Sequence, residues 1–115
     1  MTMTPNEYQK LAMRTCAFKS DIYHNPNATK HAVFGLCAEA GEVAGIFQKS
    51  YQGHEIDQDH LMKELGDVLW MLAELCESYG FAIEDVMILN IQKLRKRYPD
   101  GFDAEHSLHR AEGDI

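Results

Sequence analysis

The chain has 115 residues, of which 45% are hydrophobic, and its formal net charge at pH 7 is -7. This length fits one domain with a large surface relative to its core, so we expect the chain to form an oligomer. The negative charge opposes the phosphate contacts that dominate affinity for DNA and RNA, which excludes nucleic acid as an expected partner. An acidic chain still binds a polyphosphate where a divalent cation lies between them.

The cysteines and the hydropathy indicate the compartment. Cys16, Cys37 and Cys76 are odd in number and form no CxxC pair, which argues against a disulfide framework and a zinc site. No apolar run approaches the roughly 20 residues that span a bilayer, and residues 1–9 are polar. We therefore expect a cytoplasmic protein with reduced thiols and no contact with a membrane.

Prolines and turn-forming residues divide the chain into four predicted helices and no strand. The first helix covers about 5–18, and a loop through residues 20–27 follows it. The second covers about 29–51 and ends before Gly53. The third begins after an N-cap at Asp57 or Asp59 and ends at Gly80. The fourth covers about 83–98, with acids in its first turn and bases in its last.

The apolar pattern predicts how these helices assemble. The third helix carries the clearest period, and Trp70 lies outside its main stripe, so this helix should lie centrally or at a subunit interface. We expect an all-α, four-helix, bundle-like fold that is completed by oligomerisation. The chain is predicted to be a single domain, residues 1–115, with a helical core at about 5–98 and a polar, irregular C-terminal tail at 99–115.

Two of the predicted helices each carry two carboxylates three residues apart. These pairs are Glu39 with Glu42, and Glu64 with Asp67. Residues at this spacing lie on one side of a helix, one turn apart. Both pairs border apolar arcs, so they face the seam between helices. Like charges so close repel each other, and a cation that prefers oxygen ligands, such as Mg²⁺ or Mn²⁺, offsets that repulsion.

Alternative interpretations of the acids stay open at this point. An acidic pair on an amphipathic helix is usually a solvated face, which is the ordinary reading of either pair alone. A di-iron carboxylate bundle would need Glu-x-x-His motifs, which both pairs lack. Glu74 and Glu77, further along the third helix, are interpreted as solvated positions. Single histidines such as His31 and His60 could touch a substrate, but they more often lie at the surface or behind the ligating residues.

The fourth helix supplies the complementary charge. Asn90 lies on its apolar stripe, and Lys93 and Arg97 follow on the same side, which forms a basic ridge suited to anionic oxygens. Lys and Arg in a last turn are also ordinary complements of the helix dipole. On the second helix, Lys49 lies within two turns of Glu42 and is a further candidate for a phosphate contact.

Three blocks of this sequence resemble the MazG-like nucleoside triphosphate pyrophosphohydrolases. The blocks are GLCAEAGEV at 35–43, KELGDVLW at 63–70 and NIQKLRKRYPDGF at 90–102, in the order that the family has them. The resemblance implies an all-α, Mg²⁺-dependent hydrolase, in which Mn²⁺ can substitute. Its reaction would convert a canonical, deoxy or modified nucleoside triphosphate to the monophosphate and pyrophosphate, as in house-cleaning of the nucleotide pool.

The resemblance also implies roles for particular residues. Metal binding falls to the four paired acids, and either Glu39 or Glu42 would accept the proton of the attacking water. Substrate binding falls to the basic ridge and its neighbours, namely Asn90, Lys93, Arg97 and Tyr98, and the position of Lys49 adds that residue to the expected phosphate contacts. A homodimer or homotetramer would close the pocket. The family's longer motif has a further acid where this chain has Ala38, so no fifth carboxylate is expected.

Two other functions stay open on the sequence alone. One is a non-catalytic oligomeric scaffold or regulator in which the acids are solvated. The other is a related phosphoanhydride hydrolase, similar to a phosphoribosyl-ATP pyrophosphatase. The sequence does not indicate the base or the sugar, and the candidate neighbours of a base are Thr15, Phe18, His31 and Phe34.

Overall fold

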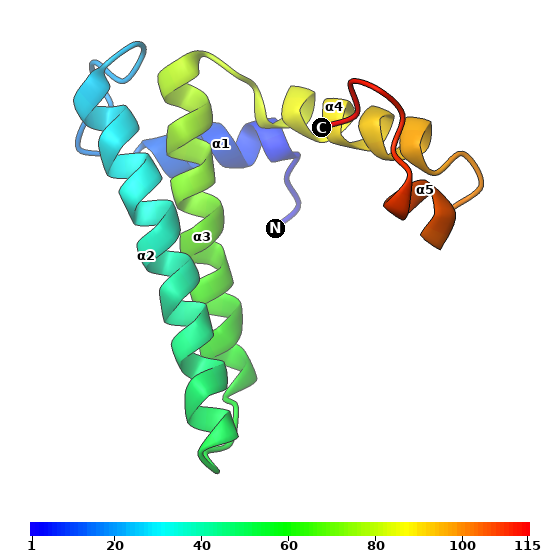
Figure 1. Ribbon diagram of the computed structural model, residues 1–115. Coiled ribbons are helices and arrows are strands. Elements are labelled where there is room, and N and C mark those ends of the chain that lie inside the picture. Colours follow the sequence, from blue (N-terminus) through cyan, green and yellow to red (C-terminus); the bar gives the residue numbers. More distant parts are fainter.

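The computed structural model describes residues 1–115 and contains five helices and no strand (Figure 1). The helices are α1 (Pro5–Met13), α2 (Pro26–Tyr51), α3 (Gln58–Tyr79), α4 (Ile83–Arg97) and α5 (Ala104–Leu108). The predicted all-α class and its four main helices are therefore confirmed. No helix combines the length and the apolar character that crossing a membrane requires.

Helix α1 ends earlier than the sequence pattern predicts. It begins after Thr4, whose hydroxyl accepts the amide of Glu7 at 3.1 Å, and it ends at Met13, so its predicted end at residue 18 was wrong. The chain then turns, and the amide of Cys16 donates to the carbonyl of Met13 at 3.1 Å. The apolar residues after Met13 lie in these turns and pack against α3. Their spacing is also compatible with a continued helix, so the sequence pattern alone extends the first helix through them.

Helices α2 and α3 run antiparallel as a long hairpin (Figure 1). Helix α2 begins at Pro26, three residues before its predicted start, because Asn25 caps it and proline suits the first helical position. The predicted cap of α3 is confirmed, since the carboxylate of Asp57 accepts the amide of Asp59 at 3.0 Å. Gly80, with φ 71°, ends α3 as predicted, in a conformation that favours glycine.

The buried core lies at one end of this hairpin, where α1 crosses it. It contains small and sulfur-containing residues, together with two isoleucines: Ala12, Met13, Cys16, Ile22, Ala28, Ala73, Cys76 and Ile83. Small side chains let the helices approach closely: a Cβ built on Gly35 of α2 would lie 2.3 Å from Sδ of Met71 on α3. The side chain of Met71 therefore packs directly against the backbone of α2 at Gly35.

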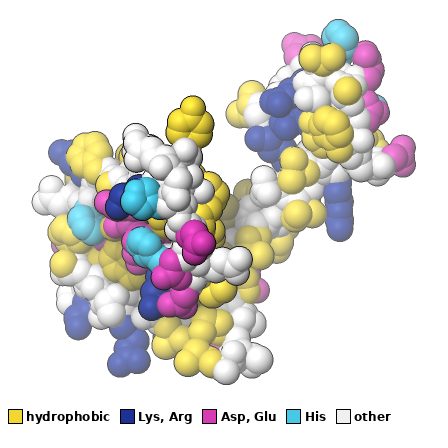
Figure 2. Space-filling view, turned by 90° about the horizontal axis from the view of Figure 1, so that it is seen from below, with side chains coloured by type: hydrophobic (Ala, Val, Ile, Leu, Met, Phe, Trp, Pro, Cys, Tyr) yellow, Lys and Arg dark blue, Asp and Glu magenta, His cyan; other side chains and the backbone are white.

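Helix α4 projects away from the hairpin and contacts α1 at its own first turns (Figure 1). The amide of Ile83 donates to the side chain of Gln9 at 2.7 Å, which anchors this junction. The tail was predicted to be irregular, but it contains α5, whose cap is the carboxylate of Asp103 accepting the amide of His106 at 3.1 Å. Figure 2 shows α4 and α5 as a second mass joined to the rest by a narrow bridge.

The single chain leaves much apolar surface exposed. Only 12 of 115 residues are buried, and the accessible surface is 8790 Å², against about 6,400 Å² for a compact monomer of 13.1 kDa. The radius of gyration is 17.2 Å, whereas a compact chain of this length has about 13 Å. The exposed apolar side chains include Met87, Ile88 and Leu89 on α4 and Phe34 and Met62 on the hairpin. Such a surface indicates association with another chain.

Candidate metal centre

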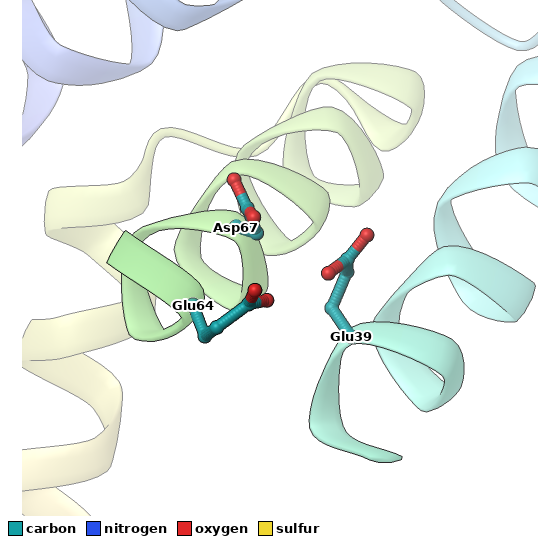
Figure 3. A group of neighbouring side chains, drawn as sticks. All are labelled: Glu39, Glu64 and Asp67. Atoms are coloured by element: carbon teal, nitrogen blue, oxygen red, sulfur yellow. The ribbon is translucent and has the colours of Figure 1, made fainter. Parts of the chain in front are cut away.

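Three of the four predicted acids meet in the middle of the hairpin. Glu39 of α2 faces Glu64 and Asp67 of α3, and one carboxylate oxygen from each lies within 4.8 Å of the other two (Figure 3). We call these residues the acidic trio. The trio forms because the i, i+3 spacing puts Glu64 and Asp67 on one side of α3, and the antiparallel packing brings Glu39 opposite them.

The surroundings of Glu39 disfavour the charged form of its carboxyl group. The pKa of its carboxyl group is raised above the ordinary value, first by partial burial and then by the charges of Asp67, Glu64 and Glu42. Three carboxylates so close repel one another, so the arrangement is most stable when it takes up protons or a cation.

The acidic trio fits a small divalent cation. Mg²⁺ holds oxygen ligands at roughly 2.0–2.1 Å, so opposite ligand oxygens lie about 4 Å apart, and small side-chain rotations bring the observed oxygens to that spacing. All three donors are carboxylates, which favours Mg²⁺ or Mn²⁺ over zinc or iron. A Cβ built on Gly41 or Gly66 would meet nothing within 4 Å, so neither glycine is packed against a neighbouring element.

The fourth predicted acid, Glu42, lies one turn beyond Glu39 on α2 and is exposed. It is outside the group whose oxygens lie within 4.8 Å of one another, but its charge still contributes to the raised pKa of Glu39. Its predicted metal role stays a prediction. Lys49 is exposed in the last turn of α2, two turns beyond Glu42.

One histidine for which the sequence leaves more than one position open, His60, contacts the acidic trio. Nε2 of His60 lies 3.1 Å from Oε1 of Glu64, one turn further along α3. The i, i+4 spacing of these residues is the sequence signal for this contact. The ring of His60 therefore restrains the carboxylate of Glu64 from the outer side of α3.

Within one chain, the basic ridge of α4 (Asn90, Lys93 and Arg97) is remote from the acidic trio. Helix α4 points away from the middle of the hairpin, where the trio lies (Figure 1). Asn90 and Lys93 are exposed, whereas Arg97 is held by Asp114: Nε donates to Oδ2 at 2.7 Å and Nη2 to Oδ1 at 2.7 Å. Tyr98 caps α4, and its ring lies 5.8 Å from Cζ of Arg97.

A buried carboxylate lies two turns beyond the acidic trio on α3. Glu74 has 0% exposure, and its oxygens contact Nδ1 of His31 at 2.6 Å and Sγ of Cys16 at 2.9 Å. Glu77 is partly buried and accepts a hydrogen bond from the side chain of Gln9 at 2.9 Å. The interpretation of Glu74 and Glu77 as solvated was wrong, because α1 and the following loop cover this end of α3.

Three predicted neighbours of a base lie together near this carboxylate. The ring centroid of His31 is 6.1 Å from that of Phe18 and 6.3 Å from that of Trp70. The indole Nε1 of Trp70 donates to Oγ1 of Thr15 at 3.1 Å. Phe34, the fourth candidate, is 69% exposed on α2.

Comparisons with known proteins identify the family. Residues 28–102 match the model of the MazG nucleotide pyrophosphohydrolase domain. The uncharacterized protein YvdC of Bacillus subtilis (strain 168) is 34% identical over 92 residues, which cover 68% of this chain and 87% of that protein. The Gene 37 protein of Mycobacterium phage L5 is 32% identical over 76 residues, which cover 62% of this chain and 67% of that protein. No solved structure shows a significant match.

The matched residues contain nearly all of α2 and the whole of α3 and α4. They therefore include the acidic trio on the hairpin and the basic ridge on α4. The domain implies an activity of the nucleotide pyrophosphohydrolase type. The chain belongs to the MazG nucleotide pyrophosphohydrolase family.

Proposed function

We propose that this protein is a Mg²⁺-dependent hydrolase that converts a nucleoside triphosphate to the nucleoside monophosphate and pyrophosphate, and that Mn²⁺ can replace Mg²⁺. One observation carries the proposal: in a chain of the MazG family, three carboxylates from two helices come within 4.8 Å of one another. House-cleaning of the nucleotide pool is the corresponding role.

The roles of the acids follow from their positions. Glu39, Glu64 and Asp67 would hold the metal. A bound metal would neutralise negative charge on the phosphates. Glu42 is exposed and outside the acidic trio, so its carboxylate is free to accept the proton of the attacking water. A role for Glu42 as a fourth metal ligand, which the resemblance implies, is the alternative. Titration of Mg²⁺ into Glu42→Gln separates them, because a general base can be lost without loss of metal affinity.

A second copy of the chain is proposed to complete the site. The basic ridge lies away from the acidic trio of its own chain, so Lys93 and Arg97 reach a bound triphosphate only if α4 comes from a partner. The accessible surface exceeds that of a compact monomer by about 2,400 Å², and a standard interface takes about 800 Å² from each partner. We propose a homodimer, with a homotetramer as its pairwise assembly, and we place Asn90, Tyr98 and Lys49 at the rim of the shared site.

The activity is tested with a panel of nucleoside triphosphates in the presence of Mg²⁺, with the products identified by chromatography. The expected products are the monophosphate and pyrophosphate. Glu39→Gln, Glu42→Gln and Asp67→Asn should each abolish pyrophosphate release and keep the helical circular dichroism. Glu55→Gln is the matched control, since it removes an exposed acid outside the acidic trio. Full activity in all variants, or release of a diphosphate and phosphate, would exclude the proposal.

The two other functions give different results in the same experiments. A scaffold shows no joint rise in melting temperature with Mg²⁺ and a triphosphate. A phosphoribosyl-ATP pyrophosphatase-like enzyme shows a joint rise with Mg²⁺ and phosphoribosyl-ATP, and it cleaves that compound but none of the nucleoside triphosphates of the panel.

Sharing of the site between two copies is tested by mixing inactive variants. A homodimer of Glu39→Gln and one of Arg97→Gln, after exchange of subunits, give mixed dimers in which one of two sites is intact. About a quarter of the wild-type activity should return, because half of the dimers are mixed. No recovery after proven exchange would mean that each chain supplies both groups to its own site.

A further inference from the structure

We propose that the basic end of α4 and the segment 103–115 form a binding pocket for a polyphosphate group, and that Asp114 of the same chain blocks this pocket until the anion displaces it from Arg97. The inference rests on the proposed function, because it takes Arg97 as a ligand of phosphate. The new element is Asp114, which competes with that phosphate for Arg97. The segment 103–115, which lies outside the matched residues 28–102, thereby receives a role.

The contact between Arg97 and Asp114 has the geometry with which a guanidinium group holds a phosphate. Nε and Nη2 of Arg97 donate in parallel to the two carboxylate oxygens, at 2.7 Å and 2.7 Å. Arginine recognises carboxylate and phosphate groups through this same two-pronged arrangement. The side chains of Arg97 and Asp114 are only 9% and 13% exposed, so the pair is more than an accidental surface contact.

A pocket of about 340 Å³ surrounds this pair. Its lining includes three cationic residues, Lys93, Lys96 and Arg97, and two histidines, His106 and His109, which contact Asp103 at 2.6 Å and Glu105 at 2.8 Å. Its acids are Glu112 and Asp114. Small-molecule sites occupy about 300–1,000 Å³, so the pocket has the size of a ligand site. A concentration of basic residues is notable in a chain whose net charge is -7, and it gives this end of α4 a local affinity for anions.

The backbone of the segment presents Asp114 to α4. The chain reverses after α5 and returns toward α4 (Figure 1). The amide of Asp114 then donates to the carbonyl of Ala111 at 3.1 Å, which closes a turn. Gly113, inside this turn, has φ 84°, a conformation that L side chains rarely adopt. The position of Asp114 therefore depends on a turn that glycine permits.

The charges around Asp114 exceed what one carboxylate can neutralise. Its pKa is lowered, first by the hydrogen bonds from Arg97, then by the charges of Arg97, Arg110 and Lys93, against the opposing effect of burial. Three cations thus surround Asp114, and Glu112 is the one other acidic side chain in the pocket lining. A phosphate group that carries two or more charges gains more from the same surroundings, so a polyphosphate can displace the carboxylate.

Two sources of this anion share the same chemistry. One is the triphosphate chain of the substrate, and the other is free pyrophosphate, the proposed product. If the pocket receives the substrate, release of Asp114 lowers KM for the nucleoside triphosphate. If it receives the product, release of Asp114 lowers the inhibition constant of pyrophosphate and leaves KM unchanged. Either result supports the proposal, and no change in both constants contradicts it.

The binding test uses inorganic tripolyphosphate, titrated calorimetrically in EDTA so that the acidic trio holds no metal. Asp114→Asn should bind tripolyphosphate roughly tenfold more tightly than the wild type, because the competing state is lost. Glu112→Gln removes a neighbouring acid without a recorded ion pair and should change the affinity much less. Arg97→Gln should lose most of the binding.

A second variant gives an independent test in case the segment unfolds locally in Asp114→Asn. Gly113→Val strains the turn but keeps the charge of Asp114, so it should also tighten the binding of tripolyphosphate. The proposal is overturned if neither variant binds more tightly than Glu112→Gln, or if Arg97→Gln binds as the wild type does. Glu39→Gln, which tests the proposed function, should keep the metal-free affinity of the wild type, so the two proposals fail separately.

Discussion

His31 and Glu74 are joined by a contact of 2.6 Å between Nδ1 and Oε1, although Glu74 has no exposed surface. The other oxygen of Glu74 accepts the thiol of Cys16 at 2.9 Å. A fully buried carboxylate thus has a partner on each oxygen, as buried polar groups require. The contacts connect the turns after α1, helix α2 and helix α3 at the one place where the chain has a core.

Glu74→Ala should reduce the free energy of unfolding by roughly 2–4 kcal/mol, because it leaves a cavity and removes the partner of the buried Cys16 thiol and of the half-exposed His31. Urea denaturation at matched protein concentrations measures this loss. Glu55→Ala, at an exposed position, should stay within about 0.5 kcal/mol of the wild type. Equal midpoints for the two variants would show that the buried contacts contribute nothing net.

The same contact makes Cys16 a poor nucleophile. Burial, followed by the hydrogen bond to Glu74, raises the pKa of the Cys16 thiol to about 11. Burial also raises the pKa of Cys76, whereas Cys37 is exposed. Since the thiolate is the reactive form, iodoacetamide at pH 8 should label Cys37 first in the folded protein.

Peptide mapping by mass spectrometry reads out the labelled site, and the protein in concentrated urea is the control in which all three thiols react. Labelling of Cys16 as fast as that of Cys37 in the folded protein would contradict the buried arrangement.

Much of the fold could be predicted because local signals act within a few residues. The caps at Asp57 and Gly80 and the prolines fix the helix ends through backbone hydrogen bonds and φ values. The end of α1 was predicted wrongly because Cys16 and Phe18 are apolar, which a periodic pattern counts as helix. Their apolar character serves packing in the core, outside any helix. The angle of α4 could not be predicted either, since it depends on the contact of Gln9 with Ile83 across 74 residues.

The candidate site was predictable to a similar extent. The i, i+3 spacing predicted the acids of the trio, since helix geometry alone fixes their common face. The pairing of Arg97 with Asp114 carries no periodic signal, because the intervening segment reverses direction through Gly101 and Gly113. Glu74 did carry a signal, since it follows Asp67 by seven residues on the same face of α3. A single domain over residues 1–115 stays a prediction.

The close approach of α2 and α3 predicts opposite effects for two glycines. A Cβ on Gly35 would lie 2.3 Å from Sδ of Met71, whereas one on Gly45 would meet nothing within 4 Å. Gly45→Ala should stabilise the protein by up to about 1 kcal/mol through helix propensity. Gly35→Ala should be less stable than Gly45→Ala by roughly 1 kcal/mol, because the flexible end of the Met71 side chain must move. Thermal melts of both variants test this, and equal stabilities would exclude a tight seam at Gly35.

Removal of the metal should expose the repulsion within the acidic trio. In EDTA, Asp67→Asn should melt at a higher temperature than the wild type, because it removes one of three clustered charges. With Mg²⁺ the order should reverse, since the wild type gains stability from binding a ligand that the variant holds poorly. Asp59→Asn, whose carboxylate pairs with Lys63 at 3.0 Å outside the trio, is the control and should show no such reversal. A wild type that Mg²⁺ fails to stabilise would argue against a metal at this site.

Acid should release the segment 103–115 from α4. The pKa values of Asp114 and Asp103 are both lowered in the folded chain, mainly by hydrogen bonds from Arg97 and from the amide of His106. A lowered folded-state pKa gives stability that is complete above the unfolded value of about 3.9 and is lost as the pH falls through the folded value. The Hε proton of Arg97 should therefore stay protected from exchange at pH 5 and lose protection only below about pH 4. Asp114→Asn should lack this protection at every pH, and a wild-type transition above pH 5 would assign the docking to groups other than these aspartates.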